Sequence, residues 1–300
     1  MSGNGDARLL RRATVAAVGV AGALVCLKLA AWLHTGSVAL LGSLIDSLLD
    51  VAASAVNLIA VRQALVPADH EHRFGHGKAE PIAALGQAAF IAGSAAFLSL
   101  QAVDHLTHAR PVSHGLIGVA VMGVSIAATL ALVAYQRSVI RRTRSLAIAA
   151  DSLHYVGDVL VNIAVIVALV LVEWLGWSAI DPAFALAIAA YVFWNAAKIG
   201  RQALDLLMDR EFADADRQRI RAIALAHPQV RAVHDLRTRS AGPQAFIQFH
   251  LELDGEMSLS EAHRISDMVE AAVIRAFPGA EVIIHQDPAG LEEPPPAYAR

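Results

Sequence analysis

The sequence is poor in cysteine and in charged residues. Its 300 residues include one cysteine, Cys26, which excludes an intrachain disulfide and any zinc motif built from several cysteines. Charged residues make up only 17% and apolar residues 56%, whereas soluble domains have about 25% charged and about 45–50% apolar residues. With a mean hydropathy of +0.50, this composition predicts an integral membrane protein. The thirteen histidines are its most notable metal-binding resource.

Long apolar stretches dominate the first two thirds of the chain. An α-helix needs about 20 residues to cross the hydrocarbon core, and six stretches are long enough. We expect the first to be a transmembrane helix rather than a cleaved signal peptide, because it can span and further spans follow. Residues 1–10, before it, are polar and predict a disordered start. The six stretches cover residues 11–33, 37–64, 80–106, 113–137, 145–172 and 180–204.

Basic residues are distributed asymmetrically between the connections. They gather at the start of the first apolar stretch and around the second and fourth connections, whereas the other three connections offer only Arg110. The positive-inside rule therefore places both termini and the even-numbered connections in the cytoplasm. The basic residues in question are Arg8, Arg11, Arg12, Arg62, Arg73, Lys78, Arg137, Arg141, Arg142 and Arg144.

The chain becomes more charged after the six spans. Residues 208–288 predict a small cytoplasmic α+β domain with the order α-β-β-α-β. Polar and apolar residues alternate over 246–253, which is typical of a half-buried strand. Ser258 or Ser260 is a candidate cap for the following helix, and Pro278-Gly279 ends it. The sequence thus predicts a disordered N-terminus at 1–10, a six-helix transmembrane domain at 11–207, the cytoplasmic α+β domain at 208–288 and a flexible tail at 289–300.

Four ionisable residues interrupt two of the apolar stretches at matched spacing. Asp46 and Asp50 are four residues apart, as are His154 and Asp158, so each pair lies on one face of a helix. An ionised aspartate costs about 2.5–3.5 kcal/mol at the centre of a membrane helix, so three aspartates and a histidine at matched spacing need a shared explanation. One reason is a polar cluster that holds helices together or lines a water-filled cavity. The other is a four-ligand site for a divalent metal.

The ligand types narrow the choice of metal and suggest a mechanism. Nitrogen and oxygen ligands suit Zn²⁺, and also Cd²⁺ or Fe²⁺, whereas the lack of a thiolate disfavours Cu(I). All four ligands must lose protons to bind, so metal affinity falls as pH falls. Imidazole titrates near neutral pH in water, which makes His154 the best placed to exchange protons. The sequence therefore predicts a transporter that exchanges metal for protons. Asp151, three residues before His154, stays unassigned.

Two further groups of residues could bind metal outside the membrane. Asp69, His72 and His76 lie in the second connection, where a solvated loop is the simpler explanation and His70 is an equally placed competitor. The predicted α+β domain holds the second group, with one histidine in each of several elements. These histidines would converge only if the elements pack as one unit, and each could instead be an ordinary surface residue. The second group is His234, His250, His263, His285 and Asp287.

The motifs around these residues resemble those of the cation diffusion facilitator family, in particular its bacterial zinc and ferrous-iron efflux branch. The resemblance covers about residues 36–288. It implies a homodimer in the bacterial inner membrane, with six helices per protomer and a metallochaperone-like cytoplasmic domain. The matching segments are GSVALLGSLIDSLLDVAAS, PADHEHRFGHGKAEPIAAL, DSLHYVGDVLVN and HDLRTRSAGPQAFIQFHLE.

The resemblance also implies roles for the residues at the matching positions. Asp46, Asp50, His154 and Asp158 would form the transport site, and the loop group a second metal site. The cytoplasmic group would form a binuclear site in which Asp287 bridges the metals. Lys78 and Asp209 would form salt bridges near the dimer axis. The long histidine-rich loop of some eukaryotic members is absent between the fourth and fifth spans, where only a short arginine run lies.

Alternating access is the predicted mechanism: cytoplasmic metal binds the intramembrane ligands, the helices rearrange, and periplasmic protons displace the metal. A metalloenzyme is disfavoured because the sequence lacks His-Glu-xx-His and four protein ligands would close the site. A passive channel is disfavoured because permeation needs weak binding. A membrane-anchored sensor that binds zinc without transport is the remaining alternative. The expected partners are a second copy, the bilayer and protons, with no nucleic acid.

Overall fold

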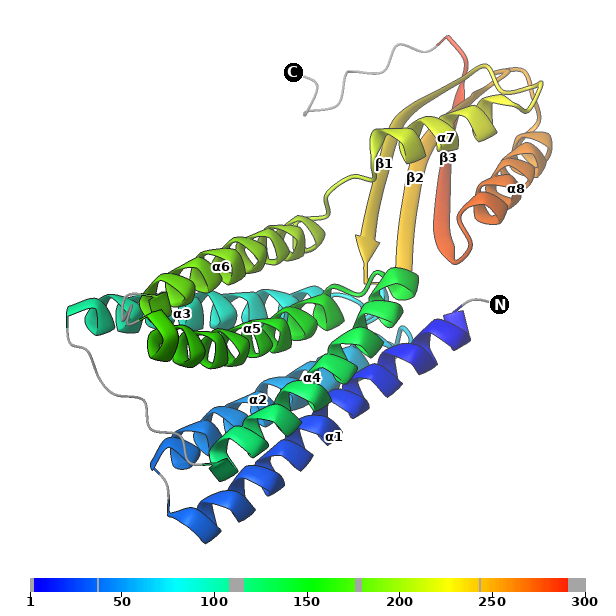
Figure 1. The fold of residues 1–300 in the computed structure, drawn as a ribbon. Helices are drawn as coiled ribbons and strands as arrows, with labels where there is room; N and C mark the ends of the chain where they lie inside the picture. Colours follow the sequence, from blue (N-terminus) through cyan, green and yellow to red (C-terminus); the bar gives the residue numbers. More distant parts are fainter. Residues whose placement is uncertain (1–2, 37, 108–115, 176–179, 243, 291–300) are drawn as a thin grey trace. The chain divides into compact units, whose positions relative to one another are not determined.

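A computed structural model describes residues 3–36, 38–107, 116–175, 180–242 and 244–290 (Figure 1). The chain divides into two compact units, Met1–Leu204 and Asp205–Arg300, and each is described by itself. Most of the tail predicted at 289–300 lies outside the described residues, as do the first two residues of the predicted disordered start.

Helices make up the first unit and confirm the predicted membrane architecture. Within the described ranges, six helices are long and apolar enough to cross a membrane. They match the six apolar stretches of the sequence. Their bounds are α1 Gly3–Thr35, α2 Val38–Ala64, α3 Ala79–Thr107, α4 Leu116–Thr143, α5 Leu146–Leu175 and α6 Ile180–Leu207.

Helix α1 begins earlier than the sequence predicts. The expectation of a disordered start is wrong for residues 3–10, which form its first turns. Leu10 is buried, and Asp6 pairs with Arg142 of α4 at 3.2 Å between Oδ1 and Nε. These two contacts offset the low apolar content of the segment. Helix α4 likewise continues through most of the arginine run that was expected in the fourth connection.

The second unit has the predicted α-β-β-α-β order. It consists of α7 (Asp214–Leu225), β1 (Ala232–Ala241), β2 (Gln244–Leu253), α8 (Leu259–Ala276) and β3 (Ala280–Pro288). Strand β2 lies in the middle, antiparallel to β1 and parallel to β3. Helix α8 is the crossover that a parallel pair requires. Ser258 caps α8 by accepting the backbone N–H of Glu261 at 3.3 Å, which decides between the two candidate caps.

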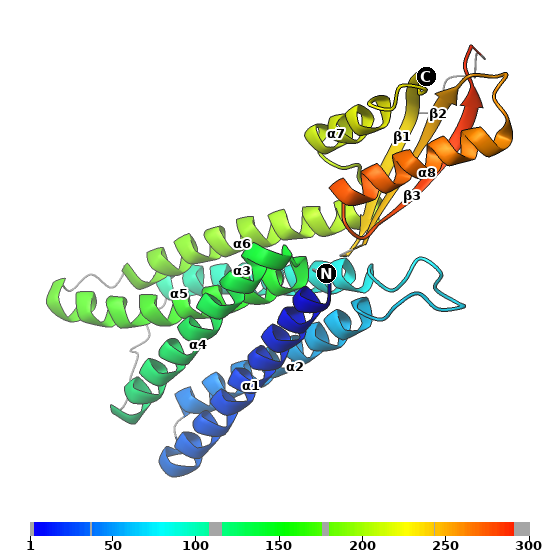
Figure 2. The same cartoon turned by 90° about the vertical axis from the view of Figure 1, so that its right-hand side faces the viewer.

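Both helices of this unit pack on the same face of the sheet (Figure 2). Ile247, Phe249 and Leu251 of β2 are buried in one core with side chains from α7 and α8. Because side chains alternate along a strand, His250 and Glu252 project from the opposite face. The predicted alternation therefore leaves a polar face that neither helix of this unit covers.

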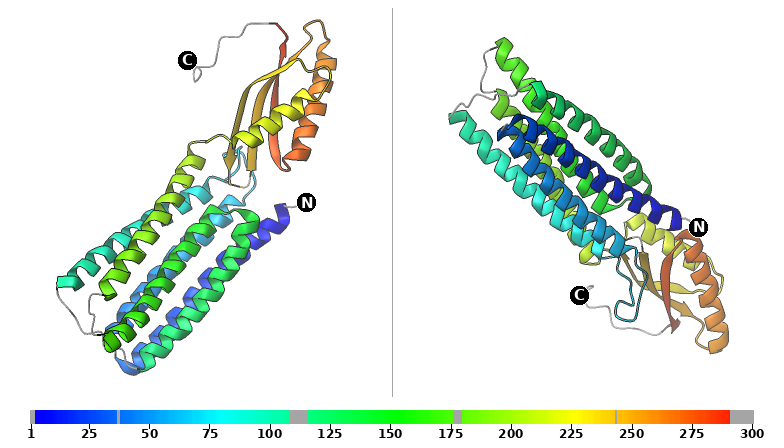
Figure 3. Two further views of the ribbon diagram at one scale, coloured as in Figure 1. Left: turned by 45° about the horizontal axis from the view of Figure 1, so that its top comes forward. Right: turned by 90° about the horizontal axis from the view of Figure 1, so that it is seen from below.

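Small residues allow the membrane helices to pack closely. Helix α1 packs along α2 and α4, and α3 packs along α5 (Figure 3). Ala84 of α3, Ala150 of α5 and Ala203 of α6 form one fully buried cluster. Small side chains let helix backbones approach, which is how helices associate where lipid supplies no hydrophobic driving force.

A buried carboxylate fixes the start of α5 against α3. Glu80, in the first turn of α3, accepts hydrogen bonds from the Ser145 hydroxyl at 2.6 Å and the Leu146 backbone N–H at 2.9 Å. The first N–H groups of a helix lack partners within the helix, and the helix dipole favours a negative charge there. Glu80 therefore anchors the helix that carries His154 and Asp158.

We predict that Glu80→Ala lowers the free energy of unfolding of the first unit by about 1–3 kcal/mol, because it leaves buried donors without an acceptor. The midpoint of thermal unfolding of the full chain in detergent micelles measures this. Glu80→Gln keeps an acceptor oxygen and loses only the charge, so its loss should be smaller. An unchanged midpoint in Glu80→Ala would show that water replaces the carboxylate at no cost.

Candidate metal centres

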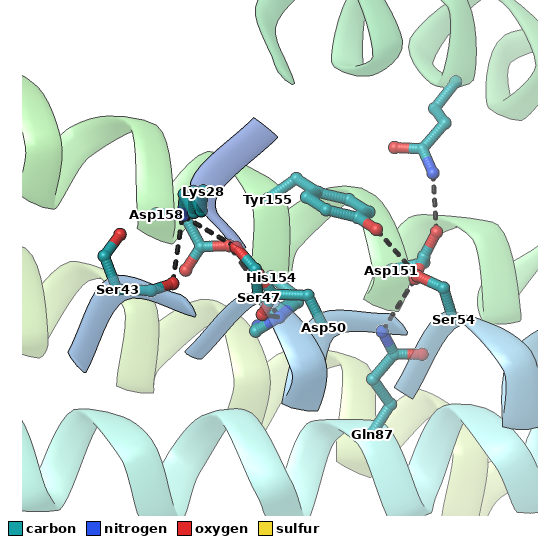
Figure 4. A network of polar contacts seen from close by, with 11 residues as sticks. Lys28, Ser43, Ser47, Asp50, Ser54, Gln87, Asp151, His154, Tyr155 and Asp158 are labelled. Atoms are coloured by element: carbon teal, nitrogen blue, oxygen red, sulfur yellow. Dashed lines mark hydrogen bonds and ion pairs between the residues drawn. The ribbon is translucent and has the colours of Figure 1, made fainter. Parts of the chain in front are cut away.

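Three of the four predicted intramembrane ligands meet between α2 and α5. His154 Nε2 lies 2.9 Å from Asp50 Oδ1 and 3.8 Å from Asp158 Oδ2 (Figure 4). One ligand atom from each of the three side chains lies within 4.8 Å of the others. Residues 104 positions apart in the sequence thus form one cluster, in which the His154 side chain is only 11% exposed.

Asp46, the fourth predicted ligand, is not part of this group: among the described residues, only Asp50, His154 and Asp158 bring ligand atoms within 4.8 Å of one another here. It is one helical turn before Asp50 and lines the same cavity, whose volume is about 700 Å³. A fourth protein ligand would therefore come from a side chain that already faces the cavity.

The cavity extends from the cluster toward one end of the helix bundle. Its walls come from residues 46–50 of α2, 89–101 of α3, 154–161 of α5 and 188–192 of α6. From Asp50 and His154 the lining runs toward the start of α2 at Asp46, toward the end of α3 at Gln101 and toward the end of α5 at Val161. The cavity thus leads away from the connection between α2 and α3.

A buried polar network lies on the other side of the cluster. Asp151, 1% exposed, accepts hydrogen bonds from Ser54 at 3.1 Å, Gln87 at 3.2 Å and Gln136 at 2.6 Å. The Ser54 and Tyr155 hydroxyls are 2.8 Å apart (Figure 4). The network joins α2, α3, α4 and α5. Sequence reasoning left Asp151 unassigned and did not single out the glutamines, whose signal was only that amides interrupt apolar helices.

The loop group also converges. Asp69 lies 3.5 Å from His72 Nδ1 and 3.4 Å from His76 Nε2, between α2 and α3. Backbone N–H groups of His72 and Glu71 donate to Asp69 Oδ1 and hold the pKa of that carboxyl below its usual range. His76 turns Nε2 toward Asp69, while its Nδ1 is buried without a hydrogen-bond partner among the described residues. His70 lies outside the group.

Strand register brings three histidines of the cytoplasmic group to one carboxylate. His234, His250 and His285 are cross-strand neighbours on β1, β2 and β3. Asp287 Oδ2 lies 2.7 Å from His250 Nδ1 and 3.4 Å from His234 Nε2, while its Oδ1 lies 3.2 Å from His285 Nε2. The two oxygens of a nearly buried carboxylate thus serve different histidines, which is the geometry a bridging ligand needs.

His263 is not brought into this cluster within the described chain. It lies on α8, 70% exposed, with Nε2 3.7 Å from Asp267. The apolar stripe of α8 faces the core, and α8 packs on the face of the sheet opposite to His250. Its position as a ligand therefore stays a prediction.

Two carboxylates that sequence reasoning did not assign also contact the cytoplasmic histidines. Glu252 Oε1 lies 3.5 Å from His234 Nε2, and Asp235 Oδ2 lies 3.7 Å from His250 Nε2. The alternation of β2 placed Glu252 on the face of His250. Asp235 lies within an irregularity in the pairing of β1, between His234 and Arg237, where its φ is 45°, so strand periodicity could not place it.

The predicted pair of Lys78 and Asp209 joins residues of different units, so it stays a prediction. Within the second unit, Asp209 Oδ1 lies 3.5 Å from Arg239 Nη1.

Both units match known protein families. Residues 14–208 match the cation efflux transmembrane domain, and residues 212–289 match the cytoplasmic domain of cation efflux proteins. The chain belongs to the cation efflux, or cation diffusion facilitator, family. The resemblance seen in the sequence is confirmed. The cation efflux family is one of transporters rather than enzymes, so the chain is an integral membrane transporter that exports divalent cations.

Relatives in this family match almost the whole chain. The cation-efflux pump FieF of Klebsiella pneumoniae is 50% identical over 284 residues, covering 95% of this chain and 94% of the pump. FieF of Serratia proteamaculans is 48% identical over 285 residues, covering 95% of both chains. The metal-bound C-terminal domain of the CzcD transporter from Thermotoga maritima is 30% identical, covering 26% of this chain and 93% of that domain, with a TM-score of 0.26.

We predict that Asp69→Asn weakens zinc binding by the loop group by about 10- to 100-fold, because it removes the charge but keeps an oxygen for the two backbone N–H groups. Since the pKa of Asp69 is already below its usual range, this carboxyl is ionised at neutral and mildly acidic pH. The pH at which remaining binding is lost should therefore not move. Zinc titration of the full chain across that range measures both quantities. The exposed neighbour Glu71 offers a control, and an equal loss in Glu71→Gln would contradict a specific role of Asp69.

We predict that Asp287→Ala weakens zinc binding by the cytoplasmic cluster by at least about tenfold, because all three clustered histidines lose their shared carboxylate. Calorimetric titration of the full chain with zinc measures the loss. Asp267→Ala removes an exposed carboxylate beside His263 and should bind zinc like the unaltered chain. Equal weakening in both variants would contradict a specific role of Asp287.

Proposed function

We propose that this protein exports Zn²⁺ from the cytoplasm in exchange for protons, with Fe²⁺ and Cd²⁺ as further candidate cargoes. The observation that carries the proposal is the meeting of Asp50, His154 and Asp158 within 4.8 Å inside membrane helices. Membership of the cation efflux family supports export, and the chemistry of the ligands supports the choice of metal.

The spacing of the ligand atoms fits a tetrahedral zinc site. With metal–ligand distances of about 2.0–2.1 Å, two ligands of a tetrahedral site lie about 3.3 Å apart. The distances from His154 Nε2 to Asp50 and Asp158, 2.9 and 3.8 Å, lie on either side of that value. Asp46 would supply the fourth ligand by turning within the cavity that it already lines.

Protons and metal compete for the same lone pairs in this cluster. A carboxylate or imidazole that takes up a proton can no longer coordinate the metal, so proton entry favours metal release. His154 lies between two carboxylates and is the natural first acceptor, because both stabilise its protonated form. Protons from the outer side would therefore drive metal outward.

The cavity supports alternating access with the cluster as its centre. If the termini are cytoplasmic, as the distribution of arginines indicates, the cavity leads to the outer side and the structure is outward-facing. The network around Asp151 then closes the cytoplasmic side. Access from the cytoplasm would require that these hydrogen bonds between four helices open while the cavity closes.

The two clusters outside the membrane would bind metal without carrying it across. We propose that the protein works as a homodimer in the bacterial inner membrane and that metal on the cytoplasmic cluster favours one arrangement of the two copies. A ligand can shift such an equilibrium only by its difference in affinity for the two states. The polar face left open by α7 and α8 gives that cluster access to a partner.

Zinc flux into proteoliposomes under an imposed pH gradient tests the proposal. We expect the unaltered protein to move zinc toward the acidic side and Asp50→Ala to reduce this flux to the background of empty vesicles. Asp104→Ala, which removes an exposed carboxylate of α3 that does not line the cavity, should retain flux.

Two outcomes would contradict proton exchange. Zinc flux that does not respond to the gradient would indicate a channel or uniporter. Zinc binding without flux, accompanied by a change in shape of the cytoplasmic domain, would favour the membrane-anchored sensor.

A further inference from the structure

A lysine lies within the membrane helices beside the metal cluster. Lys28 of α1 donates hydrogen bonds from Nζ to the Ser47 hydroxyl at 2.7 Å and to the Ser43 carbonyl at 3.2 Å. Both partners are on α2, the helix that supplies Asp46 and Asp50. Figure 4 shows Lys28 with its hydrogen bonds to these two serines, drawn together with Asp50, His154 and Asp158.

The two hydrogen-bond partners of Lys28 are neutral, so they satisfy its donors but not its charge. The charge interacts through space with Asp50, Asp158 and Asp46, all three carboxylates of the predicted transport site. An ammonium group within apolar helices is costly unless negative charges lie near it. The metal ligands themselves are therefore the counter-charge of Lys28.

Counting fixed charges relates Lys28 to the charge of the cargo. Three ionised carboxylates contribute −3 and Lys28 contributes +1, which leaves −2. One divalent cation then makes the loaded site neutral inside the hydrocarbon. Without Lys28 the same loaded site would carry −1. Asp151 is left out of this count because its three hydrogen-bond donors lie in a separate network.

We propose that Lys28 is a built-in competing cation of the transport site, which weakens metal binding and matches the site to a divalent charge. The proposal rests on the proposed metal site, although not on transport itself. A positive charge near a bound cation raises the free energy of the loaded state, which favours release. Lys28 thus acts on the metal through the carboxylates and is a specificity-determining residue rather than a ligand.

A purely structural role for Lys28 predicts the opposite change in zinc affinity when the lysine is replaced. If its hydrogen bonds only hold α1 against α2, removing them should loosen the cluster and weaken metal binding. If its charge competes with the metal, removing the charge should tighten binding. The direction of the change in zinc affinity therefore separates the two roles.

The test is calorimetric zinc binding by the full-length protein in detergent micelles. His72, His76, His234 and His250 are replaced by alanine throughout, so that the membrane cluster is the site measured. In this background Lys28→Gln should bind zinc about tenfold more tightly or better, while Lys28→Arg should stay within about twofold of the background protein. Lys198→Gln removes an exposed charge from α6 and should have no effect.

Unchanged or weaker zinc binding in Lys28→Gln would overturn the proposal, as would equal tightening in Lys198→Gln. Glutamine can still donate to Ser47, and Lys28→Met provides a second neutral variant. Thermal unfolding without metal identifies a variant that fails to fold. The binding result does not depend on flux: tighter binding in a protein that moves no zinc would support the role of Lys28 while contradicting the proposed function.

Discussion

A charge inside hydrocarbon has to be balanced by another charge or by several hydrogen bonds, and the membrane unit is arranged around this constraint. His154 lies between Asp50 and Asp158, Asp151 collects donors from three other helices, and Lys28 faces the carboxylates of the cluster. Each of these ion pairs and hydrogen bonds joins helices that would otherwise have only apolar contacts with one another. The polar residues that we propose bind the cargo therefore also join the helices to one another.

The two units differ in how they hold their candidate metal ligands. In the membrane unit the proposed ligands come from facing helices, and a rearrangement of those helices would change their spacing. In the cytoplasmic unit the histidines are held by strand register and share one nearly buried carboxylate, so their spacing is set by the sheet. A flexible site suits a cargo that must leave. A rigid site suits an ion that stays and reports its concentration.

Much of this arrangement could be predicted from local patterns in the sequence. Helical spacing paired His154 with Asp158, and strand alternation put His250 and Glu252 on one face. These local patterns could not predict hydrogen-bond partners that are distant in the chain. Gln87 and Gln136 matter because they reach Asp151 from other helices, 64 and 15 residues away. His263 follows the amphipathic orientation of α8, which turns it away from the sheet face where the other histidines meet, and no spacing rule contains that information.

The parallel pairing of β3 with β2 has a consequence for how the cytoplasmic cluster forms. Asp287 and His285 lie on the strand that joins the sheet only after the α8 crossover, so the cluster combines residues more than fifty positions apart, from β1 to β3. Parallel strands and distant contacts make the late steps of folding slow. During synthesis, the membrane helices emerge well before this last strand. A nascent chain can therefore insert in the bilayer while its cytoplasmic histidines remain separate, and the proposed metal site there would be complete only after β3 has joined the sheet.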